Sequence, residues 1–500
     1  MRHKQKSIQI IGVKLIAYLA AALASIPAWA ELTANVRDRQ SGVGTPRLYA
    51  PAATITPYRL AANSADDNIM SRDALFDDVD DSLLKSGEKS EKSTPPSGSG
   101  VRGFLQFNIA RDYESPVHWS QMMTRADLSA QGDLGNGIKW KLGARVDYDA
   151  VYDVTNFYPS AVRHDQALNF YLGENYLDIG AGDWDFRLGK QNVVWGEMVG
   201  LFFADVVSAR NMYQFILPSF DLIRITQWAA RAEYFKDDFH AELLWIPVAS
   251  YNQIGVPGAE FYPFVPPAVP GVTTQIRNEE FPSRNFSNMN YGLRLSTLKN
   301  GWDISGFAYS SMDIEPTFYR QYTVAPQPTA IYQARHSRIN QLGGTLAKDF
   351  YSFVLKTEVV YTNGRHFYVS NPSDVNGVVP QNTLDWAIGL DFTLPADTRF
   401  NAQIFQRDFF DYDPDLISDK HESGYSLLLN HRINDKLEAE VTWISSFNRT
   451  DWLFRPRVSW DVERNWRLAV GVDVFKGPPL GFFGRFADRD RVYSEVRYSF

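Results

Sequence analysis

One stretch in the first half of the chain places a few polar side chains among large apolar ones. Between residues 186 and 215 the sequence reads FRLGKQNVVWGEMVGLFFADVVSARNMYQF. Charged groups enclosed by apolar residues in this way either select what passes a narrow opening or pair to hold a segment in place. The candidates for both roles are Gln191, Trp195, Glu197, Asp205 and Arg210.

Charged residues elsewhere alternate with apolar ones. In the segment 138–150 every even position is apolar, whereas the odd positions carry lysine, arginine, aspartate and one glycine. Alternate side chains of a strand share one face. Facing rows of opposite charge would orient dipolar solutes, whereas adjacent opposite charges would pair and form a solvated lining. The candidate lining residues are Arg145, Arg187, Arg231, Glu233, Asp385, Asp391, Arg399 and Arg467.

These alternating runs indicate strands long enough to cross a membrane. Alternation over about eleven residues, with ionised groups on one face only, is typical of a tilted membrane-spanning strand. In the final segment, RVYSEVRYSF, one face carries Val496, Tyr498 and Phe500. This face resembles the terminal strand by which bacterial outer-membrane barrels are recognised for assembly. The sequence therefore predicts outer-membrane lipid and the barrel-assembly machinery as partners.

Short and long connections alternate along the chain, as in outer-membrane barrels. The predicted tight turns are at 132–137, 180–183, 236–238, 299–301, 347–349, 395–398, 434–436 and 463–465. The predicted long loops are 151–166, 196–224, 247–286, 310–335, 362–383, 408–421, 445–451 and 476–489. This spacing predicts an all-β fold over residues 101–500, a transmembrane antiparallel β-barrel of about eighteen strands. The count falls to sixteen if the weaker segments 118–130 and 452–461 are not strands.

The beginning of the chain has a different composition. Residues 1–30 combine a basic start, an apolar run and the small-residue pattern Ala28-Trp29-Ala30, which predicts a signal peptide cleaved near Ala30. Residues 31–100 are acidic and then rich in serine, proline and lysine, which predicts a flexible periplasmic or plug segment. The formal net charge of −8 gives no indication of nucleic-acid binding. The absence of cysteine excludes disulfides and thiolate metal sites.

The block around Trp195 also carries a family resemblance. The pattern GKQ-x-x-x-WGE, then Asp-x-x-x-x-Arg, then IRI-x-x-W-x-x-x-x-EYF, continues into ELLWIPVASYNQIGVPGAEFYPFVPP at 242–267. This pattern resembles a proteobacterial outer-membrane family catalogued only as a domain of unknown function. The resemblance implies a porin-like barrel in the bacterial outer membrane and, as a partner, an inner-membrane exporter. It implies no substrate.

The loop 247–286 is rich in proline and aromatic residues. Its aromatic residues Phe261, Tyr262 and Phe264 would form either an apolar platform at the outer mouth or a rigid lid packed on the barrel rim. The chain has no G-x-S-x-G, H-E-x-x-H or phosphate-loop motif. We therefore predict a protein that is not an enzyme, with no cofactor and no metal.

Two functions are compatible with these features. The first is an outer-membrane porin-like channel for passive or facilitated passage of small or hydrophobic solutes, in which the loop 196–224 forms the constriction. The alternative is a non-transporting barrel with a plugged lumen that has a structural, adhesive or exporter-partner role. A continuous path through the lumen would distinguish the two.

Overall fold

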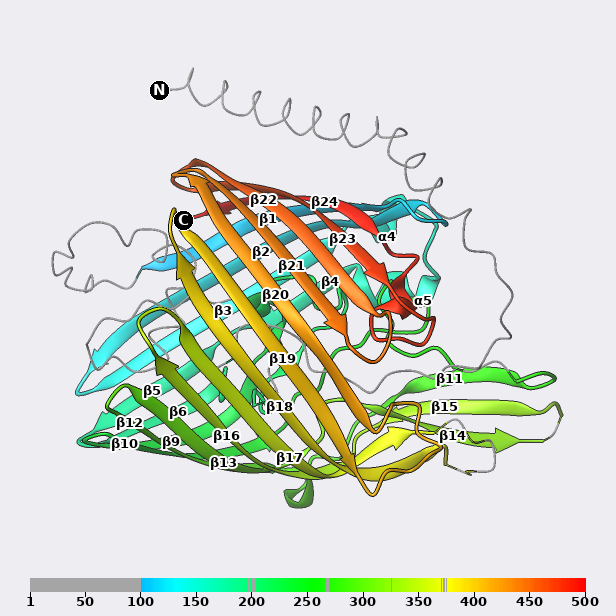
Figure 1. Cartoon of the computed structure of the whole chain (residues 1–500), viewed down its shortest axis with the longest axis horizontal. Coiled ribbons are helices and arrows are strands. Elements are labelled where there is room, and N and C mark those ends of the chain that lie inside the picture. The colour runs from blue at the N-terminus through cyan, green and yellow to red at the C-terminus, as the bar shows by residue number, and fades with distance from the viewer. Residues whose placement is uncertain are drawn as a thin grey trace. The chain divides into compact units, whose positions relative to one another are not determined.

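The chain folds into a closed antiparallel β-barrel (Figure 1). The computed structural model describes residues 100–500 except 197, 199–203, 267–268, 325, 370, 372–373 and 375. The predicted signal peptide, the predicted flexible segment up to residue 99, and Glu197 lie outside the described residues. Within the described part, no helix is both long enough and apolar enough to cross a membrane.

The barrel wall has eighteen strand positions, because β4 and β5 both pair with β3 and together occupy one position. The wall strands are β1 (Val101–Asp112), β2 (His118–Gly135), β3 (Ile138–Asp149), β4 (Leu168–Leu172), β5 (Asn175–Ala181), β6 (Trp184–Gln191), β9 (Gln227–Lys236), β10 (Phe239–Val248), β12 (Asn290–Lys299), β13 (Trp302–Met312), β16 (Arg338–Asp349), β17 (Val354–Tyr368), β18 (Val378–Leu394), β19 (Thr398–Phe410), β20 (His421–Asn434), β21 (Leu437–Ser446), β22 (Trp452–Glu463), β23 (Trp466–Lys476) and β24 (Arg491–Ser499). The weak segments 118–130 and 452–461 belong to β2 and β22, so the count of eighteen is confirmed.

The first and last strands close the barrel. β1 pairs with β2 on one side and with β24 on the other, and Leu105 lies opposite Tyr498. Backbone hydrogen bonds between Gly103 and Phe500 extend this pairing to the end of the chain. Closure leaves the wall without a free edge, which removes the unpaired backbone groups that an open sheet would present to lipid.

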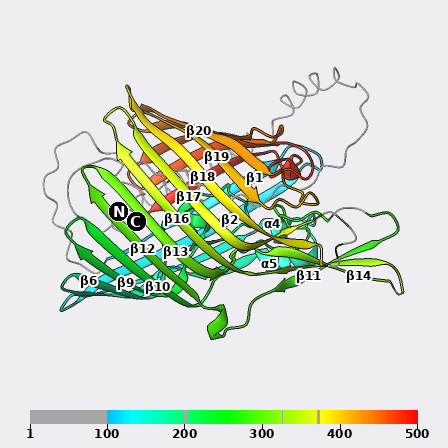
Figure 2. The same ribbon diagram turned by 60° about the horizontal axis from the view of Figure 1, so that its bottom comes forward.

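All the tight turns lie at one end of the barrel and the longer connections at the other (Figure 2). The turns at Asn136-Gly137 and Asn300-Gly301 have positive φ at both residues, which suits two-residue hairpins between twisted strands. The predicted loop 362–383 is wrong in its bounds, since only 369–377 connects β17 to β18. The Asn363-Gly364 pair marks a bulge in β17 instead of a turn, and Gly364 has a φ of +84°.

The outward face of the wall is apolar. Leu142, Leu243 and Leu342 lie on three different strands and are 55%, 53% and 63% exposed. A soluble protein rarely exposes so much apolar surface on every side, whereas a barrel in lipid requires it. The inward face carries most of the buried charged residues of the wall.

Smaller elements lie among the long connections. They are α4 (Val151–Val154), α5 (Ser160–Gln166), β7 (Ala209–Arg210), α6 (Phe220–Ile223), β8 (Arg224–Ile225), β11 (Thr273–Glu280), η1 (Phe286–Asn288), β14 (Thr317–Thr323), β15 (Thr329–Arg335) and η2 (Gly484–Phe486). The strands β11, β15 and β14 form a separate three-stranded sheet that extends beyond the wall at the long-loop end (Figure 1). The predicted loops 247–286 and 310–335 therefore contain strands of their own.

Candidate functional site in the barrel lumen

The connection between β6 and β9, residues 192–226, lies against the inward face of the wall, and we call it the inserted segment. Its Trp195 is fully buried, as are Val193 and Val207. These side chains share one hydrophobic cluster with a set of inward residues from β10 to β23, which we call the apolar belt. The apolar belt consists of Leu244, Ile246, Phe307, Tyr309, Val360, Ala387, Phe405, Ile444, Leu453 and Phe475.

Two wall glycines make room for the inserted segment. A Cβ atom at Gly292 would lie 2.5 Å from the Trp195 ring, and one at Gly389 would lie 2.9 Å from the Met198 methyl group. Both contacts are closer than Cβ atoms normally approach, so a larger residue at position 292 would displace the Trp195 ring, and one at position 389 would push aside the flexible end of Met198. Small residues on the wall therefore match large side chains on the inserted segment.

Two carboxylates of the wall bind the inserted segment directly. Glu242 on β10 accepts a hydrogen bond of 3.0 Å from the Trp195 indole N–H. Glu358 on β17 accepts two from backbone N–H groups, 2.8 Å from Met198 and 2.9 Å from Ala204. Both carboxylates are buried, and charge-assisted bonds of this kind are stronger than neutral ones. Alternation along the two strands places both side chains on the lumen face, but it does not indicate that they bind this segment.

Arginines on other sides of the wall bind the same segment. Arg145 on β3 donates to the Leu222 carbonyl at 2.7 Å, and Arg455 on β22 donates to the Leu217 carbonyl at 2.7 Å. Together with Glu242 and Glu358, these groups hold the segment from four strands spread around the barrel.

The predicted constriction residues lie within or next to this segment. The Gln191 side chain donates to the Ala229 carbonyl at 3.0 Å, which ties the end of β6 to β9. Arg210 is fully buried and donates to the Asp205 backbone carbonyl at 3.1 Å, while the Asp205 carboxylate lies 3.6 Å from Arg224. Asp205 and Arg210 thus interact inside the segment. Trp195 is the only one of these predicted residues, among those described, that bonds to a wall carboxylate.

Seven of the eight predicted lining residues pair with opposite charges on the wall. The N–O distances are 2.9 Å for Arg187–Asp178 and Arg231–Glu233, 2.5 Å for Arg407–Asp385, 2.9 Å for Lys356–Asp391, 3.4 Å for Arg145–Asp147 and 3.5 Å for Arg467–Glu438. Arg399 is half-buried and has inward parity on β19. These contacts join neighbouring opposite charges, and several of the paired side chains, such as Arg231 and Asp385, are buried.

Most of these pairs lie nearer the short turns than the apolar belt does. On β17, which begins at a short turn, Lys356 precedes Val360, and on β18, which ends at one, Asp391 follows Ala387. We call the following residues the charged belt: Asp178, Arg187, Arg231, Glu233, Lys356, Asp391, Glu438 and Arg467.

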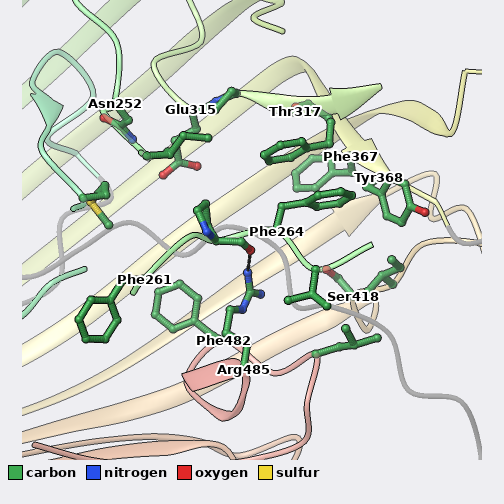
Figure 3. A pocket seen from close by; sticks show the side chains of 18 of the residues that line it. Asn252, Phe261, Phe264, Glu315, Thr317, Phe367, Tyr368, Ser418, Phe482 and Arg485 are labelled. Atoms are coloured by element: carbon green, nitrogen blue, oxygen red, sulfur yellow. Dashed lines mark hydrogen bonds between the residues drawn. The ribbon is translucent and has the colours of Figure 1, made fainter. Parts of the chain in front are cut away.

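A cavity of about 160 Å³ lies on the long-loop side of the apolar belt (Figure 3). Its lining is mainly apolar and rich in aromatic rings, and the rings of Phe264 and Phe318 are stacked with their centroids 4.0 Å apart. The rings that line it include Phe261, Phe264, Phe318, Phe367, Tyr368, Phe482 and Phe486. They come from four long connections or strand ends, so the barrel brings together residues far apart in the sequence.

The predicted aromatic loop residues contribute to this cavity from inside. Phe261 and Phe264 are buried and line the cavity, whereas Tyr262 packs partly buried against Phe318. They do not form an exposed platform at the mouth, and their packing resembles that of a lid.

Two ionisable groups are placed among the cavity rings. Arg485 donates to the carbonyls of Pro263 and Gly481, and burial lowers the pKa of its guanidinium to about 10. Burial raises the pKa of Glu315, partly offset by the charge of Arg365. The Oε2 atom of Glu315 has no hydrogen-bond partner within the described part of the chain. The cavity therefore combines apolar ring faces with few polar contacts, as small-molecule sites do.

One carboxylate positions the last of the cavity loops. Asp451 accepts hydrogen bonds from the backbone N–H groups of Phe482 at 2.7 Å, Phe483 at 3.0 Å and Gly484 at 2.8 Å. These three bonds fold the chain around η2 so that Phe482 and Phe486 face the cavity.

Comparison with solved structures finds similar barrels at low sequence identity. The crystal structure of Pseudomonas aeruginosa OccK8 (OprE) has a TM-score of 0.47 and 9% identity, covering 80% of this chain and 98% of that one. Pseudomonas aeruginosa OpdK with vanillate has a TM-score of 0.46 and 7% identity, with coverage of 80% and 98%. Salmonella typhi OmpF in complex with daunomycin has a TM-score of 0.40 and 9% identity, with coverage of 81% and 98%.

Comparison with curated proteins finds no match. A family model does match, however, and it extends over residues 13–500, which include the whole described barrel. The resemblance found in the Trp195 block is thereby confirmed. The chain belongs to the family described as protein of unknown function (DUF1302).

Proposed function

We propose that this protein is a channel of the bacterial outer membrane that passes small apolar or amphipathic molecules. In this proposal residues 1–30 direct export and are removed near Ala30, and the barrel-assembly machinery inserts the chain. The aromatic cavity receives the solute, and the inserted segment forms the barrier beneath it. An inner-membrane exporter remains a proposed partner.

The observation that carries this proposal is the apolar contact between the inserted segment and the apolar belt. A polar ion or sugar that crosses such a contact would lose hydration without gaining hydrogen bonds, which costs several kcal/mol. An apolar solute makes no strong hydrogen bonds to water that it would lose, and it would gain contacts with the rings of the cavity. The position of the aromatic cavity next to this barrier supports the same class of solute.

A deletion tests the barrier. We expect the intact chain in planar bilayers to conduct ions weakly, and a variant with residues 196–224 replaced by a short glycine–serine linker to conduct at least about 10-fold more. In cells that express the intact chain, uptake of the apolar dye phenylnaphthylamine should rise above that of cells without it. Trp195→Ala, which keeps the backbone, should raise conductance in the same direction as the deletion.

One observation favours the non-transporting alternative. The inserted segment is bonded to four strands and packed against most of the wall, so that opening it would break many contacts together. If the folded deletion variant conducts no better than the intact chain, and dye uptake is unchanged, the barrel acts as a plugged structural or partner-binding protein.

A further inference from the structure

Three potential metal ligands meet at the long-loop end of the wall, away from the inserted segment. Asp112 is the last residue of β1, His118 is the first of β2, and Glu260 lies in the connection between β10 and β12. Their donor atoms all lie within 4.8 Å of one another, with His118 Nε2 2.9 Å from Glu260 Oε2 and 3.7 Å from Asp112 Oδ2. All three side chains are buried.

The hydrogen bonds of His118 orient its other nitrogen toward the two carboxylates. Nδ1 lies 2.6 Å from the Pro116 carbonyl oxygen, which can only accept, so Nδ1 carries a proton. Phe157 stacks on the ring with a centroid distance of 3.7 Å and fixes its plane. A neutral imidazole in this orientation would direct the Nε2 lone pair at two carboxylate oxygens, so either a proton or a metal cation must lie between them. Metal-bound histidines in proteins commonly donate from their second nitrogen to a carboxylate, a backbone carbonyl or a water molecule.

Asp112 supplies an independent observation. Its side chain is fully buried, and neither carboxylate oxygen has a hydrogen-bond partner among the described residues. Ser120 is equally buried and lies close enough to Asp112 to interact with its carboxylate, but the contact does not have the geometry of a hydrogen bond. Such groups are rare in folded proteins because each one costs free energy, and they commonly mark the site of an ion or a water molecule.

Hydrogen bonds and ion pairs alone, without a metal, explain only part of this arrangement. Glu260 also accepts a 2.5 Å hydrogen bond from Tyr158 and pairs with Arg489 at 2.6 Å, so it links several connections without a metal. That role does not involve Asp112, a second buried carboxylate whose repulsion with Glu260 is offset only in part by Ser120, Arg491 and His118. A divalent cation would satisfy both carboxylates and the imidazole together.

We propose that Asp112, His118 and Glu260 bind one divalent first-row transition metal ion. One imidazole nitrogen and two carboxylate oxygens suit Zn²⁺, with bonds of about 2.0–2.2 Å. The bound ion would fasten the connection that carries Glu260 to the first hairpin of the barrel. Because Phe261 follows Glu260 directly and lines the aromatic cavity, the ion would also fix one wall of that cavity. This site is independent of whether the barrel transports a solute.

The test uses the whole chain folded in detergent and stripped of metal by a chelator. Calorimetric titration with Zn²⁺ alone should give one site per chain in the intact protein, and a rise in the thermal unfolding temperature as Zn²⁺ is added. Asp112→Asn and His118→Gln should each weaken Zn²⁺ binding by at least about 10-fold. Asp112→Asn has the same shape and removes a buried charge, so this variant should fold at least as well as the intact chain without metal.

His336→Gln is the matched control. His336 is also buried, with one ring nitrogen 2.7 Å from a backbone carbonyl oxygen and the other 2.8 Å from Glu279, a single carboxylate. This variant should bind Zn²⁺ like the intact chain. The proposal is overturned if the intact chain binds no Zn²⁺, or if Asp112→Asn and His336→Gln bind it equally well.

Discussion

The charged belt and the apolar belt are neighbouring parts of one wall, yet their side chains find partners in different places. In the charged belt, Asp178 and Arg187 lie opposite each other on adjacent strands and pair at 2.9 Å. In the apolar belt, Phe307 and Phe405 face the lumen, and there they pack against the inserted segment. The charged belt finds its partners within the wall, whereas the apolar belt depends on contacts with the inserted segment. Damage to the apolar belt should therefore affect both barrier and stability, and damage to the charged belt should affect neither strongly.

The largest expected effect is that of Trp195→Ala. The side chain is fully buried between the wall and the inserted segment, and its loss should cost about 3–5 kcal/mol of unfolding free energy. Urea unfolding of the folded barrel measures this cost, and bilayer conductance should increase in the same variant. Trp245→Ala is the control, because Trp245 is 42% exposed on the outward face. Equal losses in the two variants would contradict the contrast between the belts.

Glu358→Ala should rank second. This change removes the acceptor of two buried backbone N–H groups, each of which costs about 1–3 kcal/mol when left unpaired. We expect faster proteolysis within the inserted segment and higher conductance, with the wall itself intact by circular dichroism. Asp391→Asn, on the neighbouring strand and in the charged belt, should leave the segment protected from protease.

The pH dependence of the cavity should be smaller and should depend on Glu315. Because burial holds its pKa above the ordinary value of 4.5, the folded chain binds this proton more tightly than the unfolded chain does. The resulting stabilisation is full below pH 4.5 and is lost as the pH rises through the raised pKa. Glu315→Gln should therefore stabilise the loops at neutral pH and flatten the change in unfolding temperature between pH 4 and pH 8. An unchanged slope would show that another group titrates there.

The sequence predicted what local patterns determine. Alternation along β18 separated Asp385 and Asp391 from their apolar neighbours, and short polar runs located the hairpin turns, two of which contain an asparagine–glycine pair. Both signals are contained in a few consecutive residues. The predicted loop 362–383 was wrong in its bounds, because Asn363-Gly364 forms a bulge within β17 and the strand continues beyond it.

The anchors and the cavity could not be predicted in this way, since their partners are distant in the chain. The bond from Trp195 to Glu242 spans 47 residues and that from Met198 to Glu358 spans 160. Inward parity identified Glu242 and Glu358 as lumen residues but gave no sign of which segment they bind. The apolar belt could not be predicted from the sequence for a different reason. At Ile404-Phe405 consecutive residues are both apolar, so alternation no longer separates the lipid face from the lumen face.

The smallest expected effect lies in the charged belt, and it gives the comparison its baseline. Asp178→Asn breaks the pair with Arg187, but Asp178 is 26% exposed and water can replace the lost partner. Pairs of this kind contribute about 0.2–1 kcal/mol, and the contribution falls as salt screens the charges. We expect urea unfolding to shift by no more than this amount at low salt and by less at 1 M salt, with conductance unchanged. A loss as large as that of Trp195→Ala would mean that the charged belt also supports the inserted segment, and the two parts of the wall would then have to be treated as one.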